Sequence, residues 1–185
     1  MEKNKKPIFK RIWFWIIVVV VIIIAIASSQ GGNGEPKETN GSTPVQELKL
    51  GETWNVDGQW NLTINSVETT EERNQFDETN PQQVVYVTYT YENLGYEDSN
   101  GIMEGLYFSL EPGIDATIID SNGEMADSYP NSVKTYPQET PVGAKCVNAQ
   151  TCIGLNNVSD TITMNISKYD GNGKQQKVTY KLDVK

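Results

Sequence analysis

The stretch VYVTYTY, residues 85–91, decides the fold of this chain. One set of side chains, Val85, Val87, Tyr89 and Tyr91, alternates with another, Tyr86, Thr88 and Thr90. Successive side chains of a β-strand point to opposite faces, so a period of two is typical of a strand with one buried face. Val, Thr and Tyr also favour strands over helices. The stretch therefore predicts a half-buried β-strand.

The same period extends outward in both directions along the chain. It recurs at Trp60, Leu62 and Ile64 and at Ile162, Met164 and Ile166, and further β candidates are residues 53–56, 106–110, 116–119, 145–155 and 178–184. Turn formers separate these runs at residues 56–58, 93–95, 120–123 and 170–173. Asn-Gly and Asp-Gly pairs suit turns with positive φ, which predicts hairpins. Residues 68–81 form a long polar interruption, which predicts a solvated loop or one short helical turn.

Seven to nine short strands with frequent turns and no amphipathic helix predict an all-β fold, a β-sandwich over residues 48–185. Five segments of this region carry a resemblance to a known family: GETWNVDGQWNLTINSVE (51–68), VVYVTYTYENLG (84–95), IIDSNGE (118–124), PVGAK (141–145) and GLNNVSDTITMNIS (154–167). They resemble the telokin-like, immunoglobulin-fold domains of unknown function attached to or secreted from Gram-positive bacteria. The resemblance implies an immunoglobulin-like sandwich outside the cytoplasm, and it brings no catalytic residues.

Composition excludes several classes of site. The 185 residues include no His, so a Ser-His-Asp triad, a Cys-His site, imidazole-ligated zinc and haem with an axial His are all excluded. Residues 1–11 hold five cations and one anion, which leaves 10 cations and 23 anions in the remainder. Such an acidic body repels phosphate backbones, so we expect no nucleic-acid binding.

The apolar run IWFWIIVVVVIIIAIA predicts a membrane segment at residues 12–29. About 20 apolar residues are needed to cross the hydrocarbon layer as a helix, and about 17 suffice at the short end. Trp13 and Trp15 stand next to the basic segment, residues 1–11, which the positive-inside rule places in the cytoplasm. The alternative is a signal peptide cleaved after the Ala25-Ile26-Ala27 triplet, which would make the protein secreted. Residues 30–47, rich in Gly, Pro and polar residues, predict a flexible linker.

The only two cysteines, Cys146 and Cys152, lie in the segment CVNAQTC. An even number of cysteines in a compartment outside the cytoplasm favours a disulfide. We expect the bridge to join two hairpin strands that meet across a turn near Asn148 and Ala149. A zinc site is excluded here, because two thiols without His cannot fill a closed tetrahedral site.

Three features are candidate functional sites. Aromatic residues indicate a binding surface for a glycan or peptide, at Trp54, Tyr96 and Tyr107, although large aromatic side chains are also typical of sandwich cores. The spacing of Asp120, Asn122 and Glu124 is like the first half of a calcium loop, but the pattern is incomplete and favours an ordinary hairpin. Scattered carboxylates could supply a glycosidase pair, which the sequence does not identify.

The sequence therefore predicts a membrane-anchored extracytoplasmic module that binds without catalysis. It contains no base beside a nucleophile, no phosphate-binding loop and no complete metal pattern, so we expect no cofactor and no metal. The expected partners are the membrane, through residues 12–29, and a protein, peptide or cell-envelope ligand on the domain. The alternatives are a small carboxylate-dependent hydrolase acting on the envelope and an accessory or immunity-type membrane subunit.

Overall fold

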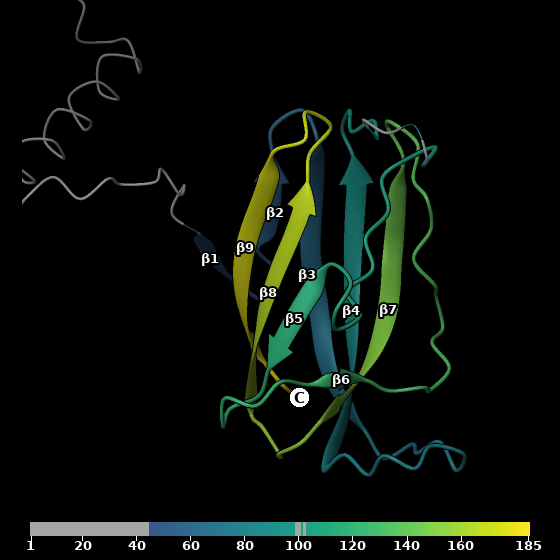
Figure 1. Ribbon diagram of the computed structural model, residues 1–185, viewed down its shortest axis with the longest axis vertical. Coiled ribbons are helices and arrows are strands. Elements are labelled where there is room, and N and C mark those ends of the chain that lie inside the picture. The colour runs from purple at the N-terminus through teal and green to yellow at the C-terminus, as the bar shows by residue number, and fades with distance from the viewer. Residues whose placement is uncertain (1–44, 99–100, 102) are drawn as a thin grey trace, which may run out of the picture. The chain divides into compact units, whose positions relative to one another are not determined.

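The computed structural model describes residues 45–98, 101 and 103–185, and these residues form two β-sheets packed face to face (Figure 1). The predicted cytoplasmic segment, the membrane segment and residues 30–44 of the predicted linker lie outside the described residues. Among the residues described, no helix is long and apolar enough to cross a membrane. The all-β class and the sandwich of two sheets are confirmed.

The four-stranded sheet has the order β1-β9-β8-β5. Its strands are β1 (Gln46–Lys49), β9 (Gln175–Asp183), β8 (Thr161–Tyr169) and β5 (Ala116–Ile119). The five-stranded sheet has the order β2-β3-β4-β7-β6. Its strands are β2 (Thr53–Val56), β3 (Trp60–Thr70), β4 (Gln83–Asn93), β7 (Lys145–Leu155) and β6 (Asp127–Ser128). All neighbouring pairs are antiparallel except β1 and β9, which run parallel.

The core lies between the sheets and is formed by the alternate side chains that the sequence period predicts. Its largest fully buried members include Trp60, Tyr89, Tyr91, Tyr180 and Phe108. Tyr180 of β9 ties the two sheets together: its hydroxyl donates to the Leu62 carbonyl at 2.9 Å and accepts from the Trp54 amide at 3.2 Å. A buried hydroxyl must find such partners, so this position specifies how the two sheets stack.

Two β-bulges lie side by side on either side of β4. In β3 the extra residue falls between Ile64 and Ser66. In β7 it falls between Cys146 and Ala149, which pair with Tyr91 and Tyr89 of β4. The bulge residues are linked through Thr90: Asn65 Nδ2 donates to Thr90 Oγ1 at 2.8 Å, and the Asn148 amide donates to the same oxygen at 3.1 Å. Asn148 has a φ of 55°, which Asn tolerates better than most residues. Each bulge moves all later side chains of its strand to the opposite face.

The structure differs from the sequence expectations in four segments. Gln46 and Glu47, predicted as linker, belong to β1, where they pair with β9. Glu68 to Thr70 continue β3, and the loop that follows contains no helical turn. Residues 106–110 are buried except for the half-buried Tyr107, but they form only an isolated bridge, between Leu106 and Thr140. The segment 93–95 ends β4 without a hairpin, because the Asn93 side chain accepts from the amides of Gly95 and Tyr96.

Candidate functional site

The three residues of the predicted aromatic surface do not form an exposed platform. Trp54 is 3% exposed and packs edge-on against Trp60, with ring centroids 5.5 Å apart. Tyr96 is half-buried and packs edge-on against Trp60, with ring centroids 5.8 Å apart, while Tyr107 is also half-buried. Trp54 lies in the core because β2 has one buried face. Trp54 points to that face, while its neighbours Thr53 and Asn55 point to the exposed face. Its assignment to a binding surface is therefore wrong.

The hairpin turns that begin at Asp120 and Asp170 have the same geometry. In both, the aspartate side chain accepts hydrogen bonds from backbone amides of its own turn. Asp120 Oδ1 accepts from the amides of Asn122 and Glu124 at 2.9 Å each, and Oδ2 accepts from Asn157 Nδ2 at 2.8 Å. Asp170 Oδ1 accepts from the amides of Asn172 and Lys174, and Oδ2 from Gln176 Nε2. Burial alone would raise the pKa of each carboxyl, but the hydrogen bonds outweigh it and lower the pKa below its ordinary value.

These contacts engage both carboxylate oxygens of each aspartate, and the hairpin interpretation is confirmed for both segments. In the described part of the chain, no group of three or more Cys, Asp or Glu side chains could hold a metal ion.

The predicted disulfide between Cys146 and Cys152 is absent, and both thiols are free. The expected hairpin between them is wrong, because the whole segment belongs to the single strand β7. Six residues of extended strand separate the two Cα atoms by about 20 Å, whereas a disulfide needs about 4.4–6.8 Å. The bulge at Asn148 also turns the thiols to opposite faces: Cys146 joins the core, and Cys152 joins a small outer cluster with Val84 and Tyr129.

We therefore expect the intact mass of the protein to be the same with and without reductant. Both thiols are buried, and burial raises the pKa of the Cys152 thiol to about 11, so it stays protonated at neutral pH. Iodoacetamide at pH 7.5 should label neither thiol rapidly in the folded protein and both in denaturant. A two-dalton increase on reduction would contradict this prediction.

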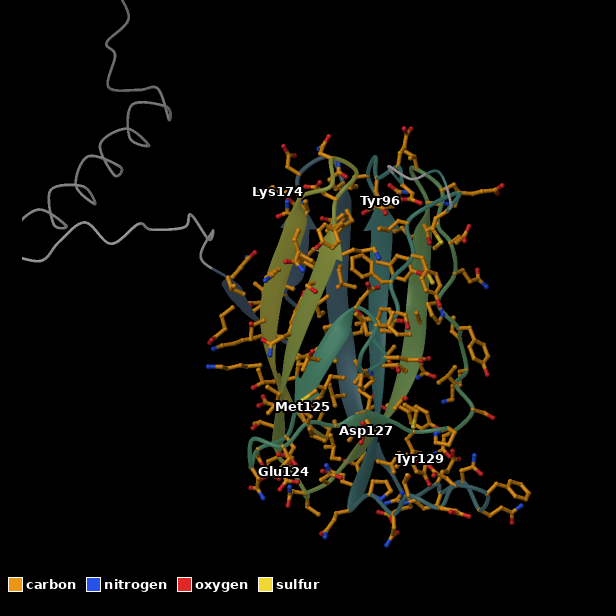
Figure 2. The ribbon with its side chains drawn as sticks, viewed as in Figure 1. Tyr96, Glu124, Met125, Asp127, Tyr129 and Lys174 are labelled. Carbon is orange, nitrogen blue, oxygen red and sulfur yellow. The ribbon has the colours of Figure 1, made fainter. Side chains whose placement is uncertain are left out.

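A pocket of about 280 Å³ lies along the edge of β7 that faces away from β4. β6 pairs with β7 through Asp127 and Ser128, and the chain then continues along β7 as the strap, residues 129–137. The strap remains bonded to β7 at two points, through the Tyr129 amide to the Cys152 carbonyl and the Gln150 amide to the Thr135 carbonyl, both at 2.9 Å. Figure 1 shows this segment beside β7, and Figure 2 marks Asp127 of β6 and Tyr129, the first residue of the strap. Between the two bonds the strap leaves the ladder, and the pocket opens there.

We call this hollow the β7-edge pocket and define it by its lining. The lining residues are Glu111, Ser128, Tyr129, Pro130, Asn131, Val133, Tyr136, Pro137, Gln150, Thr151 and Cys152. Thr151 is 4% exposed, and its Oγ1 is buried with no hydrogen-bond partner among the described residues. A buried hydroxyl without a partner is costly, by about 1–3 kcal/mol, and such a group calls for an explanation. Tyr136 is 66% exposed at the rim.

Two other hollows lie along β8 and β9 of the four-stranded sheet. The larger, about 440 Å³, is lined by Lys49, Leu50, Thr161, Ile162, Thr163, Lys181, Leu182 and Asp183. The other, about 350 Å³, is lined by Val45, Thr117, Asn165, Ile166, Ser167, Gln175, Lys177, Val178 and Thr179. Neither is lined by a buried polar atom that lacks a partner. The β7-edge pocket is the better candidate site, although it is smaller, because two tyrosines and two prolines line it and the other two hollows have neither.

Sequence reasoning did not find this site. Its residues come from three separate stretches, around Glu111, along the strap and around Thr151. The nearest signal was the spacing of Pro130, Pro137 and Pro141, which is typical of an ordered, extended loop. The partner of that loop could not be read from the sequence.

Comparison with known proteins gives a likeness of fold. No family model and no curated protein matches the chain. The YjhA protein of Bacillus subtilis superimposes with a TM-score of 0.53 at 17% identity, covering 74% of this chain and 99% of that one. MPT63, a secreted protein from Mycobacterium tuberculosis, gives a TM-score of 0.46 at 12% identity, covering 77% and 99%. The likeness to YjhA shows that this chain shares the fold of another small all-β domain.

Proposed function

We propose that this protein is a membrane-anchored, extracytoplasmic binding module that holds a protein, peptide or cell-envelope ligand in the β7-edge pocket. The observation that carries the proposal is the lining of the pocket, which combines two tyrosines and two prolines with the carboxylate residue Glu111. Ligand pockets typically combine apolar walls with a few polar groups that fix orientation. Here Tyr129, Tyr136 and Pro137 are walls of that kind, and Glu111 is such a polar group.

The fold and its attachment complete the proposal. The sandwich is immunoglobulin-like, of the telokin-like type found in Gram-positive bacteria, and residues 12–29 anchor it with the domain outside the cell. The sequence resemblance and the positive-inside rule support this arrangement.

The module acts without catalysis. Three carboxyl groups, those of Glu92, Asp120 and Asp170, have a pKa displaced downward, mainly by hydrogen bonds. A glycosidase acid needs a raised pKa, so none of these three is suited to that role. Purified full-length protein should not turn over glycosidase or esterase substrates. Turnover that is lost on changing one carboxylate to its amide would overturn this part of the proposal.

Site-specific photo-cross-linking in native membranes tests the binding function. Full-length protein carries benzoylphenylalanine in place of Tyr136, at the rim of the pocket. The matched control places it at Tyr169, which is similarly exposed, at 61%, but belongs to β8 of the other sheet. We expect at least a fivefold higher yield of a discrete adduct from position 136. Equal yields from both positions, or no adduct from either, would contradict the proposed site.

A further inference from the structure

We infer that the outer face of the four-stranded sheet binds a linear polyanion of phosphodiester-linked polyol units. The phosphate groups of the polymer lie against the ammonium groups of Lys49, Lys177 and Lys181, and its hydroxyl groups bond to side chains of β8. We call this surface the β8–β9 face and define it by the residues that line the two hollows on these strands. It is a different surface from the β7-edge pocket, and the inference does not depend on the proposed function.

The two hollows, of about 440 and 350 Å³, continue one another along the strands. Thr163 and Lys181 are paired across β8 and β9 in the first hollow, and Asn165 and Thr179 are paired in the second. Residues two apart on a strand share a face and lie about 6.6 Å apart. Figure 1 shows β8 and β9 side by side. An elongated ligand can therefore occupy both hollows.

The β8–β9 face is cationic on a domain that is acidic. The chain after residue 11 contains 10 cations and 23 anions, whereas three lysines and one carboxylate, that of Asp183, line the two hollows. Lys181 pairs with Glu47 at 3.0 Å, but Lys49 and Lys177 are in none of the ion pairs found among the described residues. Each hollow thus offers one unpaired ammonium group. The rest of the domain repels a polyanion, so binding is confined to this face.

Lys49 and Lys181 stand side by side on neighbouring strands. They are direct partners in the parallel register of β1 and β9, and both are exposed. Adjacent strands lie about 4.8 Å apart, and like charges opposite each other destabilise a sheet. The Glu47 carboxylate bonds to Lys181 and leaves Lys49 without an ion pair. An anion between the two ammonium groups relieves the repulsion that remains.

The spacing of the lysines favours a polymer over a single small anion. Lys177 and Lys181 are four residues apart on β9, which is about 13 Å along the strand. A lysine ammonium binds phosphate as a point charge, so successive phosphates of one chain can meet successive lysines. The only arginine in the described part of the chain, Arg73, lies outside this face.

The uncharged side chains of the face favour a polymer that carries hydroxyl groups. From the start of β8, the four successive outward-facing residues all carry a hydroxyl or an amide: Thr161, Thr163, Asn165 and Ser167. Thr179 Oγ1 donates to Asn165 Oδ1 at 2.7 Å, which fixes the orientation of both side chains. Hydroxyl and amide groups both donate and accept, as polyol hydroxyls do. Insertion into a bilayer needs apolar side chains, which these four positions lack.

Titration with three polymers tests the inference. The full-length, ¹⁵N-labelled protein in phosphatidylcholine nanodiscs is titrated separately with poly(glycerol phosphate), with hyaluronate, a carboxylate polymer, and with dextran, a neutral one. We expect poly(glycerol phosphate) to shift the amide resonances of residues 161–167 and 177–181 with a submillimolar Kd. Raising the salt from 50 to 500 mM should weaken this binding at least tenfold. Hyaluronate should bind at least fivefold more weakly, and dextran should cause no shift.

Three variants and one control separate the roles of the residues. Lys49→Gln and Lys177→Gln should each weaken binding of poly(glycerol phosphate) at least threefold, and Thr163→Val, which removes one hydroxyl, at least twofold. Lys49→Gln should also raise the melting temperature of the ligand-free protein slightly, because it removes one of two opposed like charges. Lys134→Gln is the matched control: Lys134 is exposed and outside the ion pairs found in the described residues, but it belongs to the strap. It should leave binding unchanged.

The resonances of the face decide the outcome, because polymer bound to the basic residues 1–11 does not shift them. If hyaluronate binds as tightly as poly(glycerol phosphate), the face recognises charge alone and the inference is overturned. It is also overturned if poly(glycerol phosphate) leaves these resonances unchanged while phosphatidylglycerol, added to the nanodiscs in equal part, shifts them, because the face then contacts the membrane. Cross-linking from position 136 should be the same in Lys49→Gln and Lys177→Gln as in the wild type, since the two surfaces are separate.

Discussion

Replacing Trp60 with alanine is expected to lower the free energy of unfolding by about 3–5 kcal/mol. Trp60 is fully buried at the start of β3, and its ring packs edge-on against Trp54, Tyr96 and Phe108 at centroid distances of 5.5–5.8 Å. Alanine would leave a cavity that a core tied by strands on both sides cannot close. Urea denaturation followed by circular dichroism measures the loss.

Trp60→Phe is the matched variant for this prediction. Phenylalanine keeps an aromatic ring against the same three neighbours, and it removes the indole N–H, which is buried without a partner among the described residues. Trp60→Phe should therefore lower the free energy of unfolding by less than half as much as Trp60→Ala does. If the two variants unfold at the same urea concentration, the ring contacts do not stabilise this part of the core.

Replacing either Asp120 or Asp170 with alanine should lower the free energy of unfolding by about 2 kcal/mol at pH 7. Each substitution removes three hydrogen bonds to an ionised carboxylate at a hairpin tip near water. The folded pKa of each carboxyl lies below its unfolded value. The contribution is therefore fully present above the unfolded pKa, near 4, and is lost as the pH falls through the folded pKa.

The pH dependence is what separates this prediction from a general loss of packing. Urea denaturation at pH 7 and at pH 2.5 measures the free energy of unfolding of the wild type and of each variant. The difference between wild type and variant should be smaller at pH 2.5 than at pH 7. Asp57→Ala is the matched control: Asp57 also stands at a hairpin tip, between β2 and β3, but it is exposed and its side chain makes none of these bonds. A difference that stays constant with pH would show that the carboxylate charge is not responsible.

Much of the fold could be predicted because the information is local. The alternation at residues 85–91 reports directly which side chains of β4 face the core, and Val85, Val87, Tyr89 and Tyr91 are all fully buried. The hairpins at Asp120 and Asp170 were equally readable, since an Asp followed three residues later by Gly contains both the acceptor and the residue with positive φ. These features depend on residues that are neighbours in the chain.

The errors arose where one local pattern has two structural outcomes. Asn148 does adopt the positive φ expected of a turn residue, but in the structure it makes a bulge in β7 and the strand continues. The choice depends on β4, because Thr90 accepts from the Asn148 amide and holds the bulge against its counterpart in β3. Nothing within residues 146–152 encodes that contact, so the disulfide was predicted between thiols that lie on opposite faces of one sheet.

The sequence by itself determined the all-β class, the period of the strands, the acidic hairpins and the exclusion of every site that needs histidine, because each of these follows from composition or from residues close together in the chain. Only the tertiary structure decided the order of the strands, the burial of Trp54 and the separation of the two cysteines. It also formed the β7-edge pocket, where Glu111, Tyr136 and Thr151 meet although long stretches of chain separate them. Such contacts arise from the packing of whole strands and loops, which a periodic pattern cannot specify.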